Sequence, residues 1–296
     1  MIKPNFLIVG VARCGTTSLF KYLSQHPEID FGTLKEPKYF SSIDLTFPQK
    51  GPGDATIDEE IIKDRKSYFR LYESLNSIKC IGDASSDYFY FAEKTIPHIK
   101  NELGDPKIII CLRDPVERTI SAYNTCLRDS RERYLFNEAL KLEEHRIKMG
   151  YDWMWHYTQG SMYSKNLKLF LDNFTDVKVI IFEEFIQDPN STIKDIFKFL
   201  GVNSNEIVDV SNTYSNSSGK PINFFTKILA SRTGVFVQIR KLIKQLIPRE
   251  ILERIGKKLF KKVTVSETEK QELRLNFRED VKNVQSCLKG KALPWQ

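Results

Sequence analysis

The strongest constraint on the fold is an apolar run of strand length that leads through a glycine-containing turn directly into a helix. Residues 6–10 read FLIVG, a nearly continuous apolar run, as expected for a strand buried on both faces of a sheet. The turn 11–15 follows, and residues 16–25 have a helical pattern that opens with hydroxyl side chains. Backbone N–H groups and the helix dipole point into such a turn, which therefore predicts an anion site.

Similar apolar runs recur along the chain and alternate with helical patterns. The strand-like runs are 80–83, 107–112 and 177–182, with a weaker one at 28–32, and further helices are predicted at 116–127, 164–173 and 267–288. This alternation predicts an α/β fold, in which helices cover both sides of a central parallel sheet. With no repeat or linker evident, we expect residues 1–296 to form a single P-loop-like domain with a helical C-terminal region.

The bulk composition narrows the choice of partners and of compartment. The net charge of +7 favours anionic partners, without choosing among a nucleotide, a nucleic acid, an acidic glycan and a membrane surface. Five cysteines with no C-x-x-C spacing argue against a zinc site and favour a reducing compartment. No apolar run approaches the roughly 20 residues that cross a bilayer, and no cleavable signal pattern is evident, so we expect a cytoplasmic protein.

The first turn has the spacing of a P-loop but not its lysine. Gly10 and Gly15 are separated by four residues, and Thr16 stands where a P-loop NTPase has the lysine that binds the β- and γ-phosphates. Hydrolysis of ATP or GTP is therefore a poor fit. The cation lies inside the turn instead, at Arg13. The alternative interpretation is a plain strand-to-helix turn with a solvated arginine.

A second turn of this kind follows the strand-like run 107–112. Asp114 can cap the next helix, and Pro115 suits its first turn. Arg113 then falls at the carboxyl end of a strand, where open parallel sheets bind ligands, and Ser121 lies along the helix, close enough to share a phosphate with Arg113. A capped helix with solvent-facing arginines would explain Asp114 and Pro115 but leaves Arg113 and Ser121 unexplained.

The two turns, in this order, resemble the phosphate-binding motifs of the sulfotransferase family, in particular bacterial members similar to glycan and heparan-sulfate sulfotransferases. The first resembles G-x-x-[KR]-x-G-T-T-x-L, and the second resembles R-D-P-x-x-R-x-x-S-x-Y. The resemblance implies that the donor is 3′-phosphoadenosine-5′-phosphosulfate (PAPS), released as PAP, and that no metal takes part. It also implies that the 3′-phosphate is bound by Arg113 and Ser121, and the 5′ end by Arg13, Cys14, Gly15, Thr16, Thr17 and Ser18.

Residues 35–40, KEPKYF, resemble a third family segment, K-E-x-x-[YF]-F. In the glycan branch its glutamate is the proposed general base, which implies that Glu36 takes the proton of the acceptor hydroxyl while Arg13 and Lys35 stabilise the leaving group. A surface Lys–Glu pair is the alternative interpretation. Lys220 falls where family members close a loop over the nucleotide, so the resemblance implies a phosphate contact there. Residues 82–88 resemble a family turn that lies beside the acceptor.

Residues 222–263 are basic and predicted to be amphipathic and helical within the same domain. In segment 238–263, lysines and arginines alternate with Leu and Ile, which is typical of a helix that lies on a membrane or binds an acidic chain. A packed helix with one solvated face has the same pattern. We expect a hydroxyl-bearing acceptor, a carbohydrate or a glycolipid, and no nucleic-acid partner. The identity of the acceptor and the oligomeric state stay open.

These patterns together predict a PAPS-dependent O-sulfotransferase. Two other functions stay open. A nucleotide-dependent phosphotransferase would need Mg²⁺ and a lysine for the γ-phosphate, and neither has an obvious provider here. A non-catalytic nucleotide-binding or membrane-associated module would depend on neither Glu36 nor Arg13 for its function.

Overall fold

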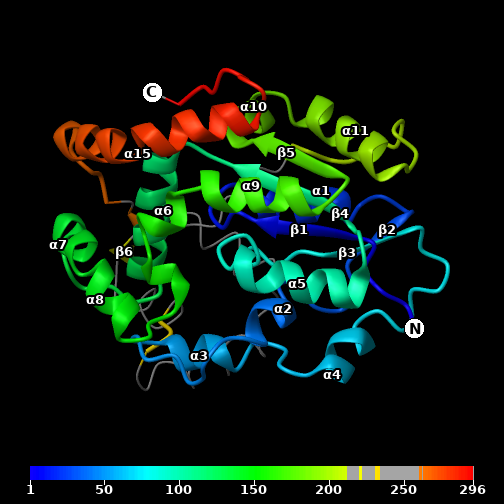
Figure 1. Ribbon diagram of the computed structural model, residues 1–296, viewed down its shortest axis with the longest axis horizontal. Coiled ribbons are helices and arrows are strands. Elements are labelled where there is room, and N and C mark those ends of the chain that lie inside the picture. The colour runs from blue at the N-terminus through cyan, green and yellow to red at the C-terminus, as the bar shows by residue number, and fades with distance from the viewer. Residues whose placement is uncertain (212–219, 222–230, 234–259, 262, 296) are drawn as a thin grey trace.

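A five-stranded sheet with parallel neighbours forms the centre of the computed structural model (Figure 1). The structure describes residues 1–211, 220–221, 231–233, 260–261 and 263–295. In spatial order the strands are β2 (Ile29–Asp30), β3 (Cys80–Asp83), β1 (Phe6–Gly10), β4 (Lys107–Leu112) and β5 (Val177–Ile181). The predicted α/β fold with a central parallel sheet is confirmed.

Helices flank the sheet, and their mutual contacts define two groups. In one group α9 (Ser164–Asn173) packs against both α5 (Ala92–Leu103) and the C-terminal helix α15 (Glu267–Cys287), which also contacts α6 (Pro115–Arg128). In the other, α1 (Thr16–Leu23) packs against α11 (Pro189–Leu200). The shorter helices are α2 (Tyr39–Ser42), α3 (Asp54–Asp58), α4 (Arg65–Arg70), α7 (Phe136–Lys141), α8 (Glu143–Lys148) and α10 (Phe182–Gln187), with 3-10 turns η1 (Trp153–Trp155) and η2 (Gln159–Ser161).

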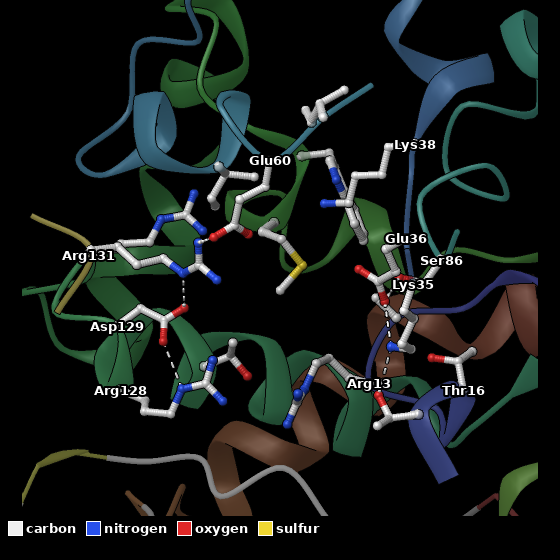
Figure 2. A pocket seen from close by; sticks show the side chains of 18 of the residues that line it. Arg13, Thr16, Lys35, Glu36, Lys38, Glu60, Ser86, Arg128, Asp129 and Arg131 are labelled. Atoms are coloured by element: carbon white, nitrogen blue, oxygen red, sulfur yellow. Dashed lines mark hydrogen bonds and ion pairs between the residues drawn. The ribbon is translucent and has the colours of Figure 1, made fainter. Parts of the chain in front are cut away.

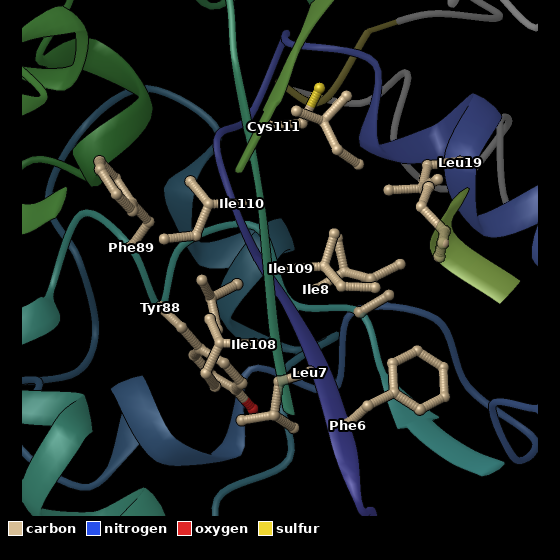
Figure 3. Packing of buried hydrophobic residues seen from close by; sticks show 14 of the residues in the cluster. Phe6, Leu7, Ile8, Leu19, Tyr88, Phe89, Ile108, Ile109, Ile110 and Cys111 are labelled. Atoms are coloured by element: carbon tan, nitrogen blue, oxygen red, sulfur yellow. The ribbon is translucent and has the colours of Figure 1, made fainter. Parts of the chain in front are cut away.

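The central strands are buried because both faces of the sheet are covered. Successive side chains of a strand point to opposite faces, and in β4 Ile108 and Ile110 lie toward Phe89 while Ile109 lies toward Leu19 of α1 (Figure 3). All five side chains are buried. Full burial of one such aliphatic side chain stabilises the fold by about 1.5–3 kcal/mol. The continuous apolar runs of the sequence reflect this two-sided cover.

Some predicted element ends differ from the structure. The weak strand expected at 28–32 is the two-residue β2, the helix expected over 16–25 ends at Leu23, and Phe182 begins α10 instead of ending β5. The prediction that residues 222–263 are helical is wrong near the C-terminal end of the range. There, β7 (Phe260–Lys261) is a strand that pairs antiparallel with β6 (Lys220–Pro221). Most of the basic region 222–263, including 238–259, lies outside the described residues. Its amphipathic helix and membrane contact stay predictions.

A buried carboxylate ties the end of β3 to the chain around residue 38. Asp83 is 1% exposed and accepts hydrogen bonds from the hydroxyls of Ser85 (2.7 Å), Tyr68 (2.9 Å) and Tyr88 (2.8 Å). The Ser85 hydroxyl itself accepts a hydrogen bond from the backbone N–H of Lys38 (3.0 Å). Since Ser85 is fully buried, it holds this segment in place and does not face an acceptor.

Replacing Asp83 by Asn is expected to change how stability depends on pH. Burial raises the pKa of Asp83 to about 6, although its three hydroxyl partners act against the rise. Because this pKa is higher in the folded than in the unfolded state, the folded protein binds the proton more readily, and the contribution of Asp83 to stability grows as the pH falls. Between about pH 7.5 and 5, the difference in free energy of unfolding between wild type and Asp83→Asn should move by about 1 kcal/mol in favour of the wild type.

Urea titrations of both proteins at the two pH values measure this difference. Using the difference between wild type and variant removes the contributions of the other titrating groups that the two proteins share. A difference that stays constant with pH would show that the pKa of Asp83 is not raised.

Candidate active site

The carboxyl ends of β1 and β4 lie side by side, and the turns that follow them form one site. Arg13 Nε donates a hydrogen bond to the hydroxyl of Ser121 (3.0 Å). Arg113 Nη1 donates to the carbonyl oxygen of Arg13 (3.3 Å). The structure thus brings together the two predicted cationic turns, although Arg13 and Arg113 are 100 residues apart in the sequence.

The first turn passes into α1 through a glycine that no other residue could replace without strain. Gly15 precedes this helix with φ 95°, in the left-handed region that favours glycine. A Cβ at this position would lie 2.8 Å from the ring of Phe182, so the site also lacks room for a larger residue. Thr16 and Thr17 open the helix and line a cavity in front of it.

Of the predicted donor contacts, Arg13, Thr16 and Thr17 line this cavity, whereas Gly15, Arg113 and Ser121 do not. Described groups of three further predicted contacts are not directed at it either. The N–H of Cys14 donates to the carbonyl oxygen of Val11 (3.1 Å), and its side chain is fully buried, so Cys14 directs neither group at a ligand. Ser18 is also buried and lies outside the cavity lining. Lys220 begins β6, but its side chain is outside the described part of the structure.

The cavity has a volume of about 380 Å³ and extends from the first turn along α6 (Figure 2). At one end it is bounded by Arg13, Thr16, Lys35, Glu36 and Ser86, and at the other by charged residues near the end of α6. Its lining is completed by the side chains of Ala12, Thr17, Leu34, Lys38, Ile57, Glu60, Ile61, Thr125, Arg128, Asp129, Arg131, Trp153, Met154 and Arg232.

Lys35 connects the first turn to the carboxylate of Glu36. Its Nζ donates hydrogen bonds to the Thr17 hydroxyl (3.2 Å) and to Glu36 Oε1 (3.0 Å), and the Ser86 hydroxyl donates to the same oxygen (3.3 Å). The side chains of Lys35 and Glu36 are 24% and 30% exposed. This pair therefore lies in the wall of the cavity and is not a solvated surface ion pair.

The environment of Glu36 keeps it ionised. Burial acts to raise the pKa of Glu36, but the charges of Lys35 and Lys38, with hydrogen bonds from Lys35 and Ser86, outweigh burial and lower this pKa to about 2. Glu36 also has φ 58°, in the left-handed region, where a residue other than glycine costs on the order of 1–3 kcal/mol. Both features fix an ionised carboxylate at one defined point of the cavity.

Arg13 lies in a region of converging positive charge. Burial, followed by the charges of Arg128 and Arg113, lowers the pKa of Arg13 to about 10. The guanidinium is still charged at neutral pH, so its burial and its like-charged neighbours favour binding of an anion that would compensate them.

The far end of the cavity is lined by charged side chains that pair with one another. Asp129 accepts a hydrogen bond from Arg128 Nε (2.7 Å) and lies 3.4 Å from Arg232 Nε. Arg232 Nη1 pairs with Glu60 (3.3 Å), and the indole of Trp153 lies nearby in the lining. Such a surface offers both hydrogen-bond donors and acceptors, which suits a hydroxyl-rich molecule.

The sequence motifs contain the residues at the first end of the cavity but not those at the far end. Glu60 follows α3, Arg128 and Asp129 close α6, and Arg232 lies much later, so no local motif contains them. One signal was present within α6. Residues four and seven positions after Ser121, namely Thr125 and Arg128, share its helical face, and both line the cavity.

Two further features concern the described ranges, namely metal-binding clusters and membrane-spanning helices. There, no cluster of three or more His, Cys, Asp and Glu side chains has an arrangement that could hold a metal ion. None of the helices within the same ranges is long and apolar enough to span a bilayer.

Comparisons with known proteins point to one family. The sulfotransferase family model matches residues 4–206. The membrane-associated sulfotransferase kil1 of Dictyostelium discoideum is 36% identical over 121 residues, 41% of this chain and 22% of that protein. Human heparan sulfate glucosamine 3-O-sulfotransferase 3B1 is 26% identical over 202 residues, 67% of this chain and 46% of that protein. The chain thus spans less than half the length of these curated relatives.

A solved structure extends the likeness to the whole chain. The crystal structure of a sulfotransferase from Alicyclobacillus acidocaldarius matches with a TM-score of 0.78 and 31% sequence identity, covering 99% of this chain and 98% of that one. The family model alone accounts for more than half of the 296 residues. On these grounds the chain belongs to the sulfotransferase family.

Proposed function

We propose that this sulfotransferase takes its sulfonate group from PAPS and transfers it to a hydroxyl of a carbohydrate or of a glycan-bearing molecule such as a glycolipid. The observation that carries the proposal is the adjacency of the turns of Arg13 and Arg113, which are joined by hydrogen bonds to Ser121 and to the Arg13 carbonyl. PAPS has anionic groups at both ends of one adenosine, and two adjacent cationic turns match that distribution of charge.

Each turn serves one end of the donor in this proposal. Arg13, Thr16 and Thr17, with the N–H groups at the start of α1, bind the 5′-phosphosulfate. Arg113 and Ser121 bind the 3′-phosphate. Arg113 Nη2 is 3.6 Å from Glu117, and its side chain is 22% exposed, so the guanidinium is oriented but still accessible.

Glu36 acts on the acceptor hydroxyl. The hydroxyl oxygen attacks sulfur in line, the bond from sulfur to the bridging oxygen breaks, PAP leaves with the electron pair, and the proton passes to Glu36. Arg13 and Lys35 stabilise the charge on the leaving group. A pKa of about 2 makes Glu36 a weak base in the free protein. When the donor draws Lys35 toward its own charge, the leading charge that lowers this pKa moves away, and Glu36 becomes more basic.

The far end of the cavity supports the choice of acceptor. Its paired arginines and carboxylates can hydrogen-bond to the hydroxyls of a sugar. Relatives named as carbohydrate and heparan sulfate sulfotransferases point the same way. The contact of Lys220 with phosphate, the membrane contact through 238–263 and the cytoplasmic location remain predictions.

Binding of PAP measured by calorimetry tests the donor assignment. We expect PAP to bind more tightly than ATP with Mg²⁺, and Arg113→Ala to weaken PAP binding by at least about tenfold, because charge-assisted hydrogen bonds to the 3′-phosphate are lost. Arg70→Ala, an exposed arginine of α4, is the control and should bind PAP like the wild type. Equal or tighter magnesium-dependent binding of ATP would instead favour a phosphotransferase.

Replacing Glu36 by Gln tests its role in proton transfer. We expect kcat to fall by about 10²–10⁴-fold, the usual contribution of a general base, while the Kd for PAP changes by less than about threefold. Glu144→Gln, an exposed carboxylate of α8 outside the cavity lining, is the control and should keep the wild-type kcat. Unchanged turnover in Glu36→Gln removes this residue from the mechanism and would favour a non-catalytic module or another base.

A further inference from the structure

Arg118 is a fully buried arginine directly behind the first phosphate turn. Its side chain is 0% exposed. Nε donates a hydrogen bond to the carbonyl oxygen of Ala12 (3.2 Å), and Nη1 donates to that of Tyr157 (3.0 Å). Nη2 is buried without a hydrogen-bond partner. The sequence motif contains this residue, but neither proposed phosphate contact accounts for it.

Two other buried arginines of the described residues, Arg131 and Arg146, are neutralised by carboxylates, whereas Arg118 is not. Arg131 pairs with Asp54 and Asp152, and Arg146 donates to both carboxylate oxygens of Glu132. Within the residues that the structure describes, Arg118 forms no ion pair and hydrogen-bonds only to backbone carbonyls. Burying an uncompensated charge is strongly unfavourable. A charged Arg118 at this position is therefore best explained by an anion that binds nearby when the protein functions.

The guanidinium has a fixed place. A Cβ on Gly160 would lie 2.5 Å from Nη1 and 2.9 Å from Cζ of Arg118, so the guanidinium lies close against this glycine. On its other side it holds the carbonyl of Ala12, the residue before Arg13. Arg13 itself has φ 75°, a left-handed conformation that needs such support from its neighbours.

The charge of Arg118 reaches the first turn. Burial raises the pKa of the Cys14 thiol to about 11, and the largest effect in the opposite direction is the positive charge of Arg118, ahead of that of Arg113. The uncompensated cation therefore adds to the positive potential where the sulfonated end of the donor is proposed to bind.

We infer that Arg118 is a positioning residue for the first turn and a buried source of positive potential for the anion bound there. It orients the Ala12–Arg13 peptide through the Ala12 carbonyl, and the bound anion compensates its charge. The inference rests on the proposed function for the identity of that anion, the 5′ end of PAPS. It does not depend on which acceptor is used.

Three substitutions separate charge from structure. Arg118→Met removes the charge and the hydrogen bonds, and Arg118→Lys keeps the charge. Arg146→Met removes a buried arginine that pairs with Glu132 and not with the turn. Calorimetry gives the Kd of each for PAP and for pyrophosphate, and thermal unfolding without ligand gives Tm. We expect Arg118→Met to weaken the binding of both ligands by about 10–100-fold, because a buried charge near the bound anion is lost. Arg118→Lys should recover part of the lost affinity.

The control has the opposite signature. Arg146→Met leaves Glu132 buried and unpaired, so its Tm should fall by on the order of 10 °C while its Kd values stay within about threefold of the wild type. If Arg118→Met does not fold, Arg118→Gln takes its place with the same expected loss of affinity, since it is also neutral.

Two results would overturn the inference. One is that the neutral Arg118 variant binds both ligands with wild-type affinity, and the other is that the lysine variant binds them as weakly as the neutral variant does. Wild-type protein that binds pyrophosphate but not PAP would refute the proposed donor, while the comparison of the Arg118 variants still decides the present inference. Wild-type protein that binds neither ligand would refute both.

Discussion

The parallel pairing of β1 with β4 is the constraint on which the site depends. The register places Phe6 beside Lys107 and Ile8 beside Ile109, so both strands end at the same edge of the sheet. Each strand is followed by a turn that contains an arginine. The two positively charged guanidinium groups would repel each other if no other interaction held the turns together. The hydrogen bond from Arg113 to the Arg13 carbonyl, together with the rigid sheet, keeps both cations at one place.

The cavity has two ends with different electrostatics. Around Arg13 the cations outnumber the carboxylates, and buried Arg118 adds a further charge from behind. At the far end Asp129 is shared between Arg128 and Arg232, so the charges there are largely paired. In the proposed function, this difference directs a strongly anionic donor to the first end and leaves the far end for a polar acceptor. This asymmetry also sets the orientation in which the two molecules would meet.

Glu36 lies at the first end of the cavity, on a backbone in the left-handed region. The left-handed residues Glu36 and Lys38 keep their conformation because the Lys38 N–H is bonded to Ser85, which is anchored on buried Asp83. The hydrogen bonds from Lys38 to Ser85 and from Ser85 to Asp83 thus help to fix the position of the Glu36 carboxylate in the cavity wall. The same segment supplies Lys35, which touches both Thr17 and Glu36 and so links the proposed donor and acceptor positions.

Local sequence was enough to predict the parallel sheet and the two cationic turns, because apolar runs, helix caps and glycine turns are encoded by neighbouring residues. The Lys35–Glu36 pair was identified by the resemblance of its segment to a family motif. Tertiary structure alone decided that the N–H of Cys14 is used inside its own turn, that Ser85 is buried, and that Glu60, Asp129 and Arg232 meet around one cavity. These facts depend on strand register and on the packing of distant segments, which pattern and spacing along one chain do not specify. The partnerless Nη2 of buried Arg118 belongs to the same class, since neighbours in space decide whether a charge is compensated.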